Sequence, residues 1–468
     1  VVVAAAAVDP LLLLAAAPAL ATVTAVWLDQ RLIVPIIIVA LPLEVSKELF
    51  PFLETENLVT GAQVSIVDFG RLAILLAMIT WVATARPNWT AYLPRSGLLL
   101  PLLLLLALYV LSLSSTVDVT AGAREATRLV FNLAFFMVVP FFVRERTALR
   151  WSFWALVGSG LALGLVGIYQ RLSDTYFFLW NPNLLLAETT RINATFANPN
   201  FYARFLDIAI VVALALLFTP QSYRRRLVLI ATIGISFLAL LLTGSRSGWF
   251  TAFLAVPLLS LLLPIKPRHK ATTLAIAAVG ATAMVLMLVF FDEALAGRFE
   301  SLRLGLGVIG ERYYLIQAGW QMFLDHPFTG VGLGGYLESL AGPYYYFVGA
   351  SGSGVIASHT SMITLLAELG ILGVGLMLFL LYRGGALCRR LYRRADAEGK
   401  VMVAALVAAF FIILISSQSE GRYFEDPYLW LFLGLAVAME GMRQRGQREL
   451  PLVAPPSTGD GGERVAEG

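Results

Sequence analysis

The sequence has little charge, one cysteine and three histidines. Only 14% of its 468 residues are charged, 59% are hydrophobic, and the mean hydropathy is +0.79. A single cysteine excludes a disulfide framework and a cysteine-based zinc site. So few charges also exclude an ordinary soluble domain, in which about a quarter of the residues are charged. The composition is typical of a membrane protein.

Long apolar runs fill most of the chain. They extend over about 20 residues, enough for a helix to cross a bilayer, whereas a membrane barrel would show alternating polar and apolar residues. We therefore predict an all-α polytopic membrane protein, a bundle of about 12 to 13 transmembrane helices with one large outward loop. Pro35 and Pro42 indicate that the second span is broken or re-entrant. The predicted spans are residues 10–28, 32–45, 67–84, 97–115, 128–143, 151–169, 201–218, 227–243, 249–264, 271–291, 360–382, 401–418 and 427–440.

Four regions follow from the order of these spans. Residues 1–291 hold the N-terminal transmembrane helices, and residues 292–359 form an outward loop with a short surface helix. Residues 360–448 hold the C-terminal transmembrane helices. Residues 449–468 are rich in Pro, Gly and charge without an apolar face, which predicts a disordered cytoplasmic tail.

Basic and acidic connections alternate along the chain. The basic ones, such as YRRR and RRLYRR, are predicted to lie in the cytoplasm. Arginine clusters of this kind anchor topology beside anionic lipids, so we predict membrane lipids and no nucleic acid as their partners. The acidic side is then outward, and its arginines need another explanation.

One outward arginine is Arg246, in the stretch TGSRSGW between two predicted spans. Gly244 and Gly248 leave the backbone there free to turn and to approach a ligand closely. An arginine at the rim of a bundle pairs with an acid, snorkels to the interface or binds an anionic ligand. The sequence around Arg246 leaves these three alternatives open.

The long outward loop holds a second arginine, Arg312, in a predicted surface helix over residues 310–327. The apolar stripe Tyr313, Ile316, Trp320, Phe323 and Leu324 has helical spacing. The following TGVGLGGY matches G-x-G-x-x-G, but no strand precedes it. We therefore predict flexible turns there, rather than a nucleotide site.

Aromatic and amide side chains flank this loop. Tyr344 and Tyr345 form an aromatic belt at headgroup level or stack on a sugar ring. Asn198 and Asn200, in RINATFANPNFYARF, cap a helix or offer hydrogen bonds to a ligand.

His359 stands at the start of a predicted span, at the membrane mouth. It is either an interfacial aromatic residue or a general base, since imidazole titrates near neutral pH. No Cys, His or Asp lies beside it at metal-ligand spacing, so we predict no metal and no cofactor.

Four segments in order, NATFANPNFYARFL, LLTGSRSGW, GRFESL followed by ERYYLIQAGWQMFLDHPFTGVGLGGY, and SHTSMITLLAELGILGVGLML, resemble the O-antigen ligase and polymerase superfamily. The resemblance covers roughly residues 150–440. It implies a metal-independent membrane glycosyltransferase of the GT-C kind in the bacterial inner membrane, with its active site facing the periplasm. The donor would be a glycan on undecaprenyl pyrophosphate, and the acceptor a lipid-linked or surface glycan such as lipid A-core.

The resemblance also assigns roles to residues. It implies that Arg246 and Arg312 bind the pyrophosphate, with Arg191 or Arg204 assisting, and that His359 removes the acceptor's proton. Guanidinium groups suit a pyrophosphate because each can bind two oxygens at once and stabilise the charge that grows as the sugar leaves.

Three alternatives remain open from the sequence. A pair of R-x10-G motifs would favour a polysaccharide polymerase. Neither arginine has this motif, because the residue eleven positions after Arg246 is Pro257 and the residue eleven positions after Arg312 is Phe323, not glycine. A protein O-oligosaccharyltransferase differs only in its acceptor. An anion transporter would show paired broken helices in two related halves, and the sequence has no such internal symmetry.

Overall fold

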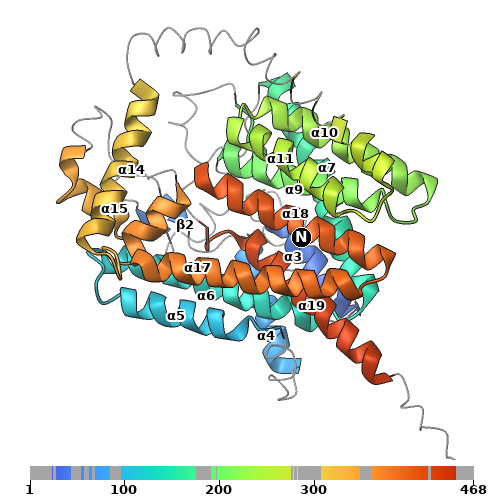
Figure 1. Cartoon of the computed structure of the whole chain (residues 1–468), viewed down its shortest axis with the longest axis horizontal. Helices are drawn as coiled ribbons and strands as arrows, with labels where there is room; N and C mark the ends of the chain where they lie inside the picture. The colour runs from blue at the N-terminus through green and yellow to red at the C-terminus, as the bar shows by residue number, and fades with distance from the viewer. Residues whose placement is uncertain are drawn as a thin grey trace, which may run out of the picture.

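The computed structural model describes the helical body of the chain (Figure 1). The described residues are 24, 28–43, 54–56, 63–65, 69–84, 96–174, 191–196, 198–272, 274–275, 278, 282, 307–347, 360–419 and 423–449. The elements are η1 Gln30–Leu32, α3 Ile33–Ala40, β1 Glu54–Glu56, β2 Gln63–Ser65, α4 Phe69–Thr84, α5 Leu99–Ser112, α6 Val119–Phe142, α7 Arg146–Ser173, α9 Pro199–Leu216, α10 Tyr223–Leu242, α11 Arg246–Leu262, α14 Gly307–Asp325, α15 Tyr336–Ala341, α17 Ser361–Arg394, α18 Ala397–Ser416, η4 Ser417–Ser419 and α19 Pro427–Glu449. Apart from the short antiparallel pair β1–β2, these elements are helical.

The predicted helical membrane fold is confirmed. Within the described residues, six helices are long and apolar enough to cross a membrane: α6, α7, α9, α10, α17 and α18 with η4. Shorter apolar helices match other predicted spans, among them α4, α5 and α11. Predicted spans 10–28 and 271–291 lie almost entirely outside the described residues, so the total of 12 to 13 and the four regional boundaries stay predictions.

The helices form two groups joined by α18 and by the short helix α3. In one group α7 packs against α9 and α10, and α11 packs against α9. In the other, α6 packs against α4 and α19, and α17 against α5. α18 contacts α9 and α11 on one side and α17 and α19 on the other, so it lies between the groups (Figure 1). The short helix α3, which corresponds to the predicted second span, is buried against α4 and α7.

The predicted surface helix is α14, and it packs against α17. Its inner face is Leu315, Ala318 and Met322, whereas Trp320 and Leu324 of the predicted stripe are exposed. The position of α14 on a membrane surface stays a prediction.

The glycine-rich segment after α14 is fixed in place by a break in α17. Gly370 interrupts α17 with a φ of 61°. Across this break, the N–H of Val331 donates to the carbonyl of Ala367 (2.8 Å), and the Glu368 carboxylate accepts from the backbone N–H of Gly334 (3.1 Å). The predicted turns are therefore present, but their amides bind α17.

The two ends of the bundle can be told apart by their charges. Tyr392, near the end of α17, donates to the carbonyl of Leu262 at the end of α11 (2.5 Å), so both helices finish at the same end. Arg146 pairs there with Asp396 (2.5 Å), and this hydrogen bond holds the pKa of Asp396 below its usual range. We call this the basic end. α11 and α17 both begin at the opposite end, which we call the Arg246 end.

Candidate active site

A tight turn between α10 and α11 presents Arg246. Gly244 has a φ of 61°, which reverses the chain, and the Ser245 hydroxyl caps α11 by accepting from the N–H of Gly248 (3.3 Å). Arg246 is the first residue of α11, and its side chain is exposed. Within the described part of the chain it has no ion pair and no side-chain hydrogen bond. The predicted pairing of Arg246 with an acid therefore finds no support.

Gly248 has a structural role that the sequence did not reveal. A Cβ at this position would lie 2.7 Å from the Cβ of Ala203 in α9. The glycine therefore lets α11 approach α9, and it brings the start of α11 beside the start of α9. The predicted close approach of this backbone to a ligand stays a prediction.

Arg191 and Asn200 hold the turn from the other side. Arg191 donates through Nε to the carbonyl of Thr243 (2.8 Å) and through Nη2 to Oδ1 of Asn200 (2.8 Å). The same Asn200 oxygen accepts from the Ser245 hydroxyl (2.9 Å). Two guanidinium groups, those of Arg191 and Arg246, therefore flank one turn at the N-terminus of a helix, where the helix dipole also favours an anion.

Asn198 caps α9, which is one of the two roles predicted for it, a helix cap or a ligand contact. Its side-chain oxygen accepts from the backbone N–H of Asn200 (2.8 Å), and Pro199 follows as the first helical residue. Loss of such a cap costs about 1 kcal/mol. Asn198 therefore fixes where α9 begins and, through it, where Asn200 lies.

Arg204 lies one helical turn below Asn200 and is buried, with 6% of its surface exposed. It forms an ion pair with Asp426, at the start of α19, and stacks over Phe201 at 5.4 Å. Asp207, three residues further along α9, is fully buried and within electrostatic reach of Arg204. Neither carboxylate oxygen of Asp207 has a hydrogen bond to a described residue. Arg204 thus has partners within the protein, and its predicted contact with substrate stays a prediction.

The buried pair gives a first testable result. Arg204→Met is expected to lower the free energy of unfolding by about 3–5 kcal/mol, because it leaves a buried carboxylate without its cation. Asp426→Leu is expected to cost a similar amount, because it leaves the buried Arg204 guanidinium without the carboxylate that it pairs with. Thermal unfolding of the purified variants in detergent measures both effects. A wild-type unfolding temperature for Arg204→Met would contradict this assignment.

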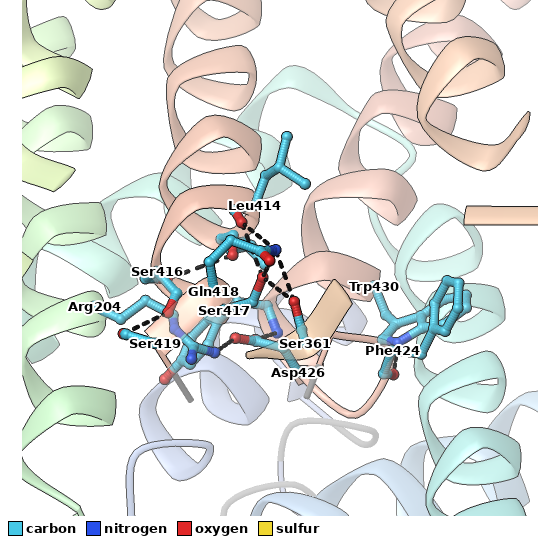
Figure 2. A network of polar contacts seen from close by, with 12 residues as sticks. Arg204, Ser361, Leu414, Ser416, Ser417, Gln418, Ser419, Phe424, Asp426 and Trp430 are labelled. Carbon is cyan, nitrogen blue, oxygen red and sulfur yellow. Dashed lines mark hydrogen bonds and ion pairs between the residues drawn. The ribbon is translucent and has the colours of Figure 1, made fainter. Parts of the chain in front are cut away.

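A second polar cluster fixes the start of α17 (Figure 2). The Ser361 and Ser417 hydroxyls are 3.0 Å apart, and Gln418 donates to the Ser361 hydroxyl (2.7 Å). Gln418 also accepts from the backbone N–H of Met362 (3.4 Å) through its side-chain oxygen. The N-cap residue of α17, Thr360, makes no side-chain hydrogen bond to the first turn of the helix. Residues at the end of α18 supply hydrogen bonds to this turn instead.

Side-chain contacts link these clusters across the Arg246 end. Ser245 binds Asn200 on α9, and one turn further along that helix Arg204 binds Asp426. Figure 2 shows Arg204 and Asp426 beside the cluster at the start of α17. The turn that carries Arg246 and the first residues of α17 consequently lie at the same end of the bundle.

The side chains of two predicted site residues, His359 and Arg312, are not among those that the structure describes. His359 lies outside the described residues and directly precedes Thr360, the first described residue of its segment. Arg312 lies in α14, which packs against α17, and a Cβ at Gly319 would lie 2.4 Å from a side-chain carbon of Ile363. α14 therefore lies beside the first turn of α17. The roles predicted for His359 and Arg312 stay predictions.

The two predicted sugar-stacking tyrosines differ in exposure. Tyr344 is buried, and its hydroxyl donates to Asp325 at the end of α14 (2.7 Å). Burial of Tyr344, and then this hydrogen bond, raise its pKa, so it remains a donor at neutral pH. Tyr345 is 56% exposed, so its ring is open to a ligand. Stacking on a sugar stays a prediction for both residues.

Several polar residues at the Arg246 end were not predicted from the sequence, above all Asp207, Gln418 and Asp426. Asp207 did carry a signal, because an ionisable residue inside an apolar helix marks a functional or tightly paired site. The polar run SSQSE at the end of α18 was a weaker signal for Gln418. No group of three or more His, Cys, Asp or Glu residues that could hold a metal occurs among the described residues.

Comparisons with known proteins agree with the motifs. Residues 231–380, from α10 to α17, match the Wzy_C family model, which is described as O-antigen ligase. Over 354 residues the chain is 22% identical to the teichuronic acid biosynthesis protein TuaE of Bacillus subtilis (strain 168), covering 71% of this chain and 69% of that protein. Arg246, Arg312 and His359 all fall within the family match. The resemblance to the O-antigen ligase and polymerase superfamily that the sequence predicts is therefore confirmed.

Proposed function

We propose that this protein is a membrane glycosyltransferase that moves a glycan from undecaprenyl pyrophosphate to an acceptor hydroxyl at the outer face of the membrane. The observation that carries the proposal is Arg246 at the N-terminus of α11, which is exposed, lies beside Arg191 and has no ion pair with any described residue. The family match supports the reaction class, a cell-surface glycan enzyme of the ligase or polymerase type.

The donor's pyrophosphate would bind at the α10–α11 turn. Arg246 is free to contact its oxygens, and Arg191 holds the turn through Thr243 and Asn200. Negative charge on the pyrophosphate grows as its bond to the sugar breaks, so preorganised guanidinium groups stabilise the transition state more than the ground state. We assign Arg312 a second contact with the same group.

His359 would act as the general base. It takes the proton of the acceptor hydroxyl while that oxygen bonds to the anomeric carbon, and undecaprenyl pyrophosphate leaves with the electrons of the broken C–O bond. One displacement inverts the anomeric carbon. Gln418 and Ser417 position this step, since they fix the first turn of α17 directly after His359.

The charge balance needs no metal in this scheme, because arginines take the role that Mg²⁺ has at other pyrophosphate sites. The acceptor is either a surface lipid such as lipid A-core or a second lipid-linked repeat unit. Similarity to a teichuronic acid biosynthesis protein supports a cell-surface polysaccharide and keeps a polymerase as the second candidate.

The test is a transfer assay with purified protein, a polyprenyl-pyrophosphate glycan and candidate acceptors in the presence of a chelator. We expect transfer by the wild type and loss of about two or more orders of magnitude in His359→Ala, in line with the contribution of a general base. Elongation of the donor itself would identify a polymerase. Transfer at the wild-type rate by His359→Ala would remove the general base, and anion uptake without transfer would favour a transporter.

A further inference from the structure

A cavity of about 370 Å³ lies between α11, α17, α18 and α19. Apolar side chains line it, among them Leu380, Val403 and Leu433. Along α17 it extends from Leu380 to Arg393, which is about 20 Å at 1.5 Å per residue. This length exceeds the depth of one leaflet, about half of a 30 Å hydrocarbon core. The cavity reaches the basic end, and its other end is lined by Tyr423, three residues before Asp426.

Two adjacent glycines create this space. Gly384 and Gly385 line the cavity from α17. A Cβ at Gly384 would meet only Leu433, at 3.3 Å, and a Cβ at Gly385 would meet nothing within 4 Å. Because glycine costs a helix about 1 kcal/mol relative to alanine, two in succession in an apolar helix need a reason such as close approach of another group.

Arg389 and Arg393 stand at the mouth of the cavity. Together with Gly385 they are spaced by four residues, so the three lie in one row along α17. Both arginines line the cavity and are exposed, and neither has an ion pair or a side-chain hydrogen bond to a described residue. Lys400, 6.0 Å from the ring of Tyr392, adds a third cation near the mouth.

Two neighbouring arginines on the same helix behave differently. Arg390 donates to the carbonyl of Ser96 (3.2 Å), and Arg383 lies against Gly97, so both are engaged with the turn before α5. Arg389 and Arg393, which border the cavity, have no such contact with a described residue.

We propose that this cavity binds one anionic phospholipid, with an acyl chain in the apolar space and the phosphate on Arg389 and Arg393. The apolar lining fits a hydrocarbon chain, and guanidinium groups are the donors that phosphate prefers. A headgroup held at the basic end assigns the lipid to the leaflet opposite the candidate active site. The site is therefore separate from the donor site and does not depend on the proposed function.

The experiment adds phosphatidylglycerol or phosphatidylcholine to delipidated protein in detergent and counts bound lipids by native mass spectrometry. We expect one phosphatidylglycerol to be retained with about tenfold higher affinity than phosphatidylcholine. In Arg389→Gln/Arg393→Gln this preference is expected to fall by roughly tenfold, which corresponds to about 1.4 kcal/mol. Gly385→Phe is expected to reduce binding of both lipids by about tenfold or more, because the ring fills the cavity.

Gly375→Phe is the matched control. Gly375 lies on the same helix, is exposed and has open space around its Cβ, but it does not line the cavity. This variant should bind phosphatidylglycerol as the wild type does, and thermal unfolding confirms that each variant is folded. Equal retention of the two lipids by the wild type, undiminished binding by Gly385→Phe, or co-purification of a polyprenyl phosphate in the cavity would each overturn the proposal.

Discussion

Arg246→Ala is expected to lower the rate of glycan transfer by about a hundredfold or more, the loss that follows removal of one preorganised donor from a developing anion. The side chain is exposed and unpaired within the described residues, so its removal should leave the unfolding temperature unchanged. Arg246→Lys keeps the charge but loses the planar fork, and should recover only part of the rate. The measurement is kcat with saturating donor and acceptor.

Arg226→Ala is the control for this result. Arg226 is also an exposed arginine, but it lies at the start of α10, at the other end of the helix that leads to Arg246. The Arg226→Ala variant should transfer glycan at the wild-type rate. If Arg246→Ala retained wild-type activity, the pyrophosphate would have to bind elsewhere and the proposed mechanism would fall.

Gly332→Ala is expected to lower the free energy of unfolding by roughly 3 kcal/mol or more, through backbone strain and overpacking together. Gly332 has a φ of 98°, and a Cβ there would lie 2.3 Å from the Cα of Thr116. Gly332 and Thr116 cannot move apart without breaking hydrogen bonds. The backbone N–H of the adjacent Leu333 donates to the Ser112 hydroxyl (2.8 Å), and the Leu333 carbonyl accepts from the Thr116 hydroxyl (2.9 Å). The readout is the unfolding temperature of the purified protein in detergent.

Gly234→Ala tests whether this loss is specific. Gly234 lies within the helix α10 and has nothing within 4 Å of a built Cβ. Alanine there should leave the protein equally stable or stabilise it by about 0.5–1 kcal/mol. Equal unfolding temperatures for the two variants would show that the glycine-rich segment is not fixed against α5 and α6.

Within the described residues, the sequence predicts helices well where one long apolar run stands between polar residues. The span predicted at 249–264 is α11 Arg246–Leu262, and the surface helix predicted at 310–327 is α14 Gly307–Asp325. Both depend on local information, namely the length of an apolar run and the spacing of its side chains. The caps set by Asn198 and Ser245 are local in the same way.

Contacts between distant segments could not be predicted in this way. Arg204 and Asp426 are 222 residues apart, and neither has a sequence neighbour that indicates the pairing. The same holds for Ser361 and Gln418. The sequence predicts flexible turns for the segment TGVGLGGY, because its hydrogen-bond partners are distant in the sequence. They lie at the break in α17 and at Ser112 and Thr116.

The most direct test uses a polyprenyl pyrophosphate with a photoreactive group next to the pyrophosphate, crosslinked to the purified protein and mapped by mass spectrometry. The account predicts crosslinks to residues 243–249 and to the start of α17 around Thr360, both suppressed by excess unlabelled polyprenyl pyrophosphate and both reduced in Arg246→Ala. Crosslinks confined to the basic end, or unchanged in Arg246→Ala, would contradict it.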